Sequence, residues 1–140
     1  MKKILTLSVI LLFAMQLMAT PMYSIFKNTT DFQNEYVKNA LMVDLEGASY
    51  QQLLQDAPSD LVVEIPLTNN LTIKVELAEN QILSDDFMVT GKTTDGEQPF
   101  NYQPGLYYKG KIVGHPNSWA AISFFDNEII GVVSFNSGSG

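Results

Sequence analysis

The sequence contains no cysteine and no arginine, and its 8 basic residues are set against 15 acidic ones. Without cysteine the chain forms no disulfide and takes no thioether lipid anchor, so its stability must come from packing or from a partner. Nucleic-acid binding needs clustered lysine or arginine to neutralise phosphates. We therefore expect no nucleic-acid partner.

Catalytic residue types are also scarce. The only histidine, His115, stands one residue before a turn proline, and neither a zinc-binding helix motif nor a serine triad motif is present. The paired acids Asp85 and Asp86, and Asp126 with Glu128, lack the alternating carboxylates of a calcium loop. We expect a surface histidine, no catalytic group, no metal site and no cofactor in this segment.

The N-terminus has the three parts of a secretory signal peptide. Lys2 and Lys3 precede an apolar run from Ile4 to Met15, and small residues end at Ala19. A membrane anchor is the alternative, but this run is shorter than the roughly 20 residues a spanning helix needs. The pattern predicts a signal peptide over residues 1–19, cleavage after Ala19 by the export machinery, and a secreted, cell-surface or periplasmic protein.

Cleavage would leave about 120 residues, the size of one domain. The leader takes two of the eight lysines, so the net charge of the remainder is 6 − 15 = −9. We interpret this acidity as favouring solubility after export.

Residues 20–60 have no sustained period and predict one or two short helices. Ser49 followed by Gln52 fits a capping box, and Pro58 would end that helix. Apolar residues at helical spacing between Asp31 and Ala40 favour a second one.

Residues 61–136 predict a β-rich domain, beginning with a hairpin. Apolar residues alternate from Leu61 to Leu67 and again from Leu71 to Leu77. A three-residue loop would pair Leu67 with Leu71 and Val63 with Val75, keeping both apolar rows on one face. We predict this loop as a type I turn with Asn70 left-handed.

A shorter strand and a three-stranded meander follow. The shorter strand is expected over Phe87–Thr90, before a turn at Asp95-Gly96. The meander strands are expected over Leu106–Val113, Ser118–Phe125 and Glu128–Phe135. Pro116 suits the second position of the first connecting turn.

Both faces of the last two strands carry apolar residues, which predicts strands covered on both sides. The expected fold is mostly β, an antiparallel sandwich or a curled barrel-like sheet with one or two short N-terminal helices. Residues 137–140 would be a frayed end or the start of a linker.

Two local patterns leave function open. Lys109 and Lys111 flank Gly110 without phosphate-loop spacing, so we expect strand lysines facing solvent and a glycine marking a bulge or a close backbone approach. A group of aromatic residues is suited either to a carbohydrate or peptide groove or to core packing. Its members are Phe100, Tyr102, Tyr107, Tyr108 and Trp119.

The run Tyr107–Ser123, with Ile130–Val133 after it, resembles the signature of the reprolysin-type (ADAM-like) metallopeptidase propeptide. The similarity extends over about Leu61–Phe135 and includes the strand and acidic turn of Leu71–Phe87. The positions that carry the signature are Tyr107, Tyr108, Gly110, Gly114, Pro116, Asn117, Ser118, Ala121, Ile122, Ser123 and Gly131. We expect these residues to be scaffold rather than contacts.

The resemblance implies a non-catalytic propeptide domain that helps a downstream zinc peptidase to fold and holds it inactive during export. Its partner would be the peptidase domain of the same precursor, and the zinc would lie in that domain. Where family members often carry a cysteine, this chain has Leu106. Inhibition by a thiol is therefore unsupported, and a steric mode is expected. The alternative is a stand-alone exported β-sandwich module that binds a glycan or a protein.

Overall fold

The computed structural model describes residues 19–28 and 40–135. Most of the predicted signal peptide, nearly all of the second predicted helix (Asp31–Ala40) and residues 137–140 lie outside these ranges. In chain order the elements are β1 (Met22–Tyr23), β2 (Phe26–Asn28), β3 (Val43–Leu45), α2 (Gly47–Asp56), β4 (Asp60–Thr68), β5 (Leu71–Glu79), β6 (Val89–Thr93), β7 (Gly96–Phe100), β8 (Leu106–Ile112), β9 (Ser118–Phe124) and β10 (Ile129–Phe135).

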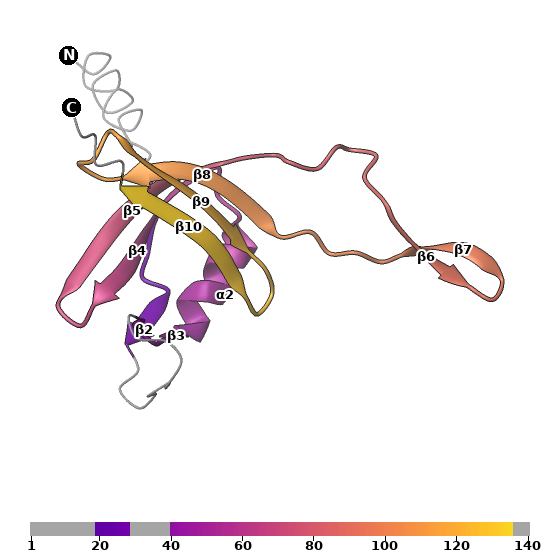
Figure 1. The fold of residues 1–140 in the computed structure, drawn as a ribbon, viewed down its shortest axis with the longest axis horizontal. Helices are drawn as coiled ribbons and strands as arrows, with labels where there is room; N and C mark the ends of the chain where they lie inside the picture. Colours follow the sequence, from indigo (N-terminus) through magenta and orange to yellow (C-terminus); the bar gives the residue numbers. More distant parts are fainter. Residues whose placement is uncertain (1–18, 29–39, 136–140) are drawn as a thin grey trace, which may run out of the picture.

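Six strands form one curled sheet in the order β1-β4-β5-β8-β9-β10. Neighbours are antiparallel except β1, which runs parallel to β4. Figure 1 shows α2 in the hollow of this sheet, with β2 and β3 beside it. The predicted mostly-β fold with a short N-terminal helix is confirmed. Within the described ranges the sheet is open and mixed, because β1 joins it from the N-terminal segment.

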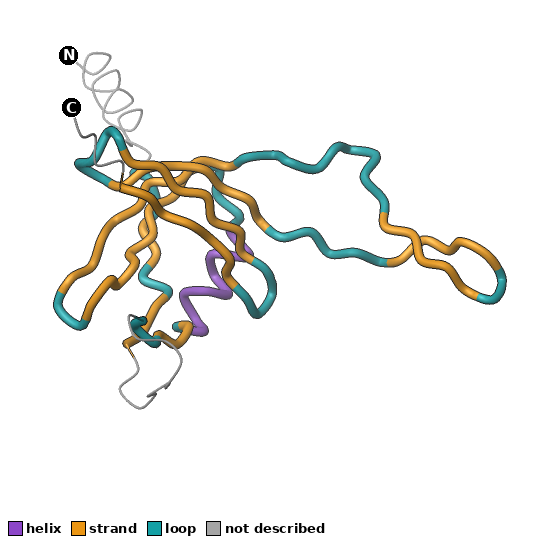
Figure 2. Tube along the Cα trace, in the orientation of Figure 1, coloured by secondary structure: helices purple, strands orange, loops and turns teal. Residues whose placement is uncertain are grey.

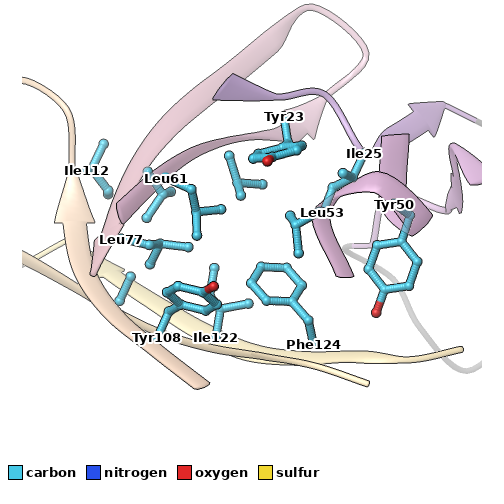
Figure 3. Packing of buried hydrophobic residues seen from close by; sticks show 13 residues of the cluster. Tyr23, Ile25, Tyr50, Leu53, Leu61, Leu77, Tyr108, Ile112, Ile122 and Phe124 are labelled. Atoms are coloured by element: carbon cyan, nitrogen blue, oxygen red, sulfur yellow. The ribbon is translucent and has the colours of Figure 1, made fainter. Parts of the chain in front are cut away.

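The core lies between the sheet and α2 (Figure 3). Alternate residues of the four central strands point to this inner face, and Tyr50 and Leu53 of the helix cover them. Phe124 packs its ring against those of Tyr50 and Tyr108, with centroids 6.4 and 5.6 Å apart. The fully buried side chains with the largest volume are Phe124, Ile25, Leu53, Leu61, Val63 and Val75.

The helix begins earlier than the capping-box prediction. Its N-cap is Glu46, whose carboxylate accepts a hydrogen bond of 2.8 Å from the backbone N–H of Ser49, so Ser49 lies inside the first turn. This bond, and the ammonium group of Lys27 at 2.9 Å, lower the pKa of Glu46 to about 2. The helix stops at Ala57, immediately before Pro58, as predicted.

A side-chain hydroxyl group of α2 is hydrogen-bonded to the end of the sheet formed by β9 and β10. The Tyr50 Oη–H group is shared between the carbonyl oxygens of Phe125 and Glu128, the latter at 3.0 Å. Burial raises the pKa of Tyr50. The helix is therefore fixed to the turn between β9 and β10.

The β4–β5 hairpin has the predicted register but a different loop. Val63 pairs with Val75 as expected, whereas Thr68 rather than Leu67 pairs with Leu71. A register shift at Leu67 takes up the extra residue, leaving a two-residue connection in which Asn70 is not left-handed. The loop prediction was wrong because it did not allow for a β-bulge.

The meander β8-β9-β10 is confirmed, with each strand ending within one residue of its expected bounds. Pro116 occupies the second position of a turn closed by a 3.0 Å hydrogen bond from the Ser118 N–H to the His115 carbonyl. A preceding turn places Gly114 at φ +81°.

Between β5 and β8 the chain leaves the body as an arm, residues 80–105. Figures 1 and 2 show two extended connections leading out to the β6–β7 hairpin. This hairpin contains the predicted Asp95-Gly96 turn, but β6 begins at Val89 rather than Phe87. Since β5 and β8 pair directly, the arm is an insertion that the sheet does not require.

Candidate interaction surface

The expectation that β9 and β10 are covered on both sides is wrong. The inner residues of β9 are buried, whereas Ile129 and Val133 on the inner side of β10 are only half-buried, and the opposite side of the sheet has no covering layer within the described residues. Trp119 is 50% exposed, Ile130 55% and Val132 49%. We call these three residues, with Tyr107 and Ala121, the outer face.

Strand register brings these side chains together. Val132 pairs with Ala121, and Ser134 pairs with Trp119. Tyr107 pairs with Ser123, which in turn pairs with Ile130. Because cross-strand neighbours on one side of a sheet have Cβ atoms about 5 Å apart, the outer face is one continuous surface across β8, β9 and β10.

Lys109 lies at the middle of this surface. It pairs in register with Ala78 on one side and Ala121 on the other, and no carboxylate of the described chain forms an ion pair with it. By contrast, Lys111 lies 3.1 Å from the carboxylate of Glu76. The outer face therefore presents apolar side chains beside one uncompensated positive charge.

Two depressions meet at Lys109. One, of about 420 Å³, is lined by Ile82, Tyr107 and residues of β9 and β10. The other, of about 1120 Å³, extends over β4 and β5 to Ala19, the predicted cleavage residue, which is exposed at its rim. The outer side of the sheet thus carries two depressions that adjoin each other at Lys109.

Glycines set the close spacing of these strands. A Cβ on Gly110 would lie 1.8 Å from the Glu76 carbonyl oxygen, which confirms the predicted close backbone approach. A Cβ on Gly131 would lie 3.0 Å from the Ala121 carbonyl oxygen. Both positions are packed against the backbone of a neighbouring strand.

Other signature residues lie in the core and in the turns. Tyr108 is buried and donates a 2.8 Å hydrogen bond to the Pro58 carbonyl; burial raises its pKa to about 12. Ile122 is buried on the inner face. Ser118 Oγ accepts a hydrogen bond from the Ile112 N–H at 2.8 Å and donates to the His115 carbonyl at 2.6 Å.

The remaining signature residues separate into two groups. Gly114, Pro116 and Asn117 build the turns after β8, while Ala121 and Ser123 lie half-buried on the outer side of β9. The structure therefore places the signature in one meander, with part of it inside and part on the exposed side.

His115 is exposed in its turn, as expected, and meets the ring of Phe135 edge to face with centroids 5.6 Å apart. Among residues 19–28 and 40–135, no three metal-ligating side chains gather into a group. Within the same ranges, no helix is long and apolar enough to cross a membrane.

The five aromatic residues singled out in the sequence do not form one groove. Tyr108 is buried in the core, Trp119 is on the outer face, and Phe100 is on the arm. Only Tyr102 and Tyr107 meet, with hydroxyl oxygens 3.3 Å apart.

Sequence reasoning missed Phe87, whose ring meets Tyr102 edge to face at 5.7 Å. It also missed the exposure of Ile130 and Val132. Alternating apolar residues on both sides of β10 were the available signal, but they were interpreted as two covered faces.

No protein-family model, curated protein or solved structure matches this chain.

Proposed function

We propose that this chain is the non-catalytic propeptide domain of a secreted zinc metallopeptidase precursor, acting as a folding aid and steric inhibitor of the peptidase domain. The observation that carries the proposal is the outer face. It lies on the same meander that bears the propeptide-like signature, and it exposes large apolar side chains that no other part of residues 19–28 and 40–135 covers.

The chemistry of the outer face suits a protein partner. An exposed tryptophan within an apolar surface suits an interface centre, where aromatic anchors carry much of the binding energy. The uncompensated charge of Lys109 favours a partner that places a carboxylate or carbonyl oxygen opposite it. A folded peptidase surface meets both requirements.

In this proposal the bulk of the domain blocks the peptidase, and no side chain of the domain binds the zinc. The outer face carries a depression, and the arm extends from the side of the body, so a partner seated on the outer face would also lie beside the arm (Figure 1). Such a domain can block access to a cleft without supplying a zinc ligand. Zinc would belong to the peptidase domain.

The test is inhibition and refolding of the peptidase encoded in the same precursor. Adding the purified domain in excess should lower peptidase activity or raise its yield on refolding. Trp119→Ala should weaken inhibition at least tenfold, because losing a central aromatic anchor commonly costs about 2 kcal/mol of binding.

Leu71→Ala provides the matched control. The exposed fraction of Leu71, 52%, is similar to that of Trp119, 50%. Leu71 lies at the tip of the β4–β5 hairpin, away from the meander. Its substitution should leave inhibition unchanged. If the wild-type domain changes neither activity nor refolding yield, the proposal is rejected.

One observation favours a second function, that of a stand-alone exported binding module. At the base of the arm Phe87, Tyr102 and Tyr107 lie together, and shallow hollows beside them are lined by Asn80 and Asn101. Aromatic rings with amide groups nearby suit a sugar. Glycan binding that Tyr102→Ala removes, with no effect of the domain on any peptidase, would favour this function.

A further inference from the structure

Strand β10 is an edge strand without the usual protection. Edges are normally blunted by lysine, proline, a bulge or an inward-pointing charge. From Ile129 to Phe135 there is no charged residue and no proline, and β10 pairs with β9 at every position without a register shift. No other described strand pairs with its free side. β1, at the other edge, has only two residues.

The direction of the free backbone groups follows from the β9–β10 ladder. The Phe125 N–H donates to the Glu128 carbonyl at 2.8 Å. Since hydrogen-bonded pairs alternate along an antiparallel ladder, every second residue from Glu128 bonds to β9. The residues between them direct N–H and C=O groups to the open edge. These are Ile129, Gly131, Val133 and Phe135.

This edge is complementary to itself. In an antiparallel pair of β10 strands centred on Val132, Gly131 of one copy faces Val133 of the other, and Ile129 faces Phe135. Ile129 thus meets Phe135, Val132 meets its own copy, and all the outward backbone groups are paired. Although the chain carries a net charge of −7, the strand is neutral, so charge repulsion along the strand itself is small.

We propose that two copies of this chain associate through β10, antiparallel and two-fold symmetric about Val132, to form one continuous sheet. Such an isologous contact closes on itself and leaves no further edge of this kind exposed. The proposal is independent of the peptidase partner. It predicts a dimer of the purified chain alone.

A single engineered cysteine reports this register, because the natural chain has none. In the proposed dimer the two Val132 residues face each other with Cα atoms about 4.5 to 5.5 Å apart, within disulfide reach. The chain should be expressed with its leader and purified as exported. Val132→Cys should then form a covalent dimer under mild oxidation.

Ile130→Cys is the matched control on the same strand and the same side. Ile130 faces Ser134 of the other copy, so the two Ile130 Cα atoms lie about 13 Å apart at the usual rise of a strand, beyond the roughly 7 Å limit. It should not crosslink. Absence of crosslinking at Val132→Cys, or equal crosslinking at both positions, would overturn the proposal.

A second variant removes one edge hydrogen bond from each copy, two in the dimer. Val133→Pro lacks an outward N–H but keeps the ladder to β9, and proline is tolerated on such edges. In sedimentation velocity over a range of concentrations, wild type and Val133→Ala should be dimers and Val133→Pro a monomer. Thermal melts establish that each variant folds. A monomeric wild type, or a dimeric Val133→Pro, would contradict the proposed dimer.

Discussion

The inner and outer faces of the meander are made of alternate residues of the same strands, yet they have opposite environments. On β9 the inner residues Ala120, Ile122 and Phe124 are buried, whereas Trp119 on the other side is half exposed. Both faces are apolar in sequence. Alternation therefore identifies two faces, but the elements that pack against the sheet decide which of them becomes core.

The largest effect is expected on the inner face. Phe124 is fully buried and packs against Tyr50 and Tyr108, so Phe124→Ala should lower the free energy of unfolding by about 3–5 kcal/mol. Urea denaturation measures this loss. A change below about 1 kcal/mol would mean that the inner face is not the core.

A smaller loss is expected where β5 and β8 approach most closely. Gly110→Ala places a Cβ against the Glu76 backbone, and the strands must separate, at a cost of about 1–3 kcal/mol or more. Gly114→Ala is the control, since no atom lies within 4 Å of its Cβ and only the positive φ is strained. If Gly114→Ala destabilised the chain more than Gly110→Ala, the close approach would be wrong.

The next effect concerns a buried hydroxyl group and depends on pH. Tyr108→Phe removes the hydrogen bond to the Pro58 carbonyl and should cost about 1 kcal/mol at neutral pH. Folding raises the pKa of Tyr108 from 10.0 to about 12, so its contribution is present below pH 10 and is lost as pH rises through about 12.

Unfolding measured from pH 8 to 12 should therefore show a shallower alkaline decline in Tyr108→Phe than in wild type. The pKa values of Tyr23 and Tyr50 are also raised, so part of the loss of stability at alkaline pH should remain in both proteins. Parallel curves for the two proteins would show that Tyr108 makes no pH-dependent contribution.

The smallest effect on stability is expected on the outer face. Trp119 is half exposed, so Trp119→Ala should change the free energy of unfolding by no more than about 0.5 kcal/mol. The same variant should weaken binding to the peptidase domain, as proposed above. A large loss of stability would show instead that the outer face is covered in the folded chain.

The strands and turns of the meander could be predicted from sequence because their signals are local. Apolar alternation and a proline at the second turn position depend on only a few neighbouring residues. The same is true of Gly110, whose place between two strand lysines indicated a bulge or a close backbone approach, and the structure has the close approach. These predictions match the structure within one residue at most strand ends.

Contacts between distant segments could not be predicted. The parallel pairing of Met22 with Val62 carries no local period, and β1 has only two residues. The predicted loop was one residue too long and the bulge at Leu67 was not predicted. These two errors offset each other, so the predicted pairing of Val63 with Val75 was still correct. The exposure of Ile130 and Val132 depends on the absence of a second layer within the described residues, which alternation does not reveal.

The Tyr50 hydroxyl has a consequence for the order of folding. Its two carbonyl partners lie 75 and 78 residues further along the chain. Contacts of such long sequence separation form late and slow the overall rate. Strands β4, β5, β8, β9 and β10 are neighbours in the sheet in chain order, but the anchor of α2 requires the turn between the last two strands. A chain emerging N-terminus first therefore anchors Tyr50 only after Glu128 is available.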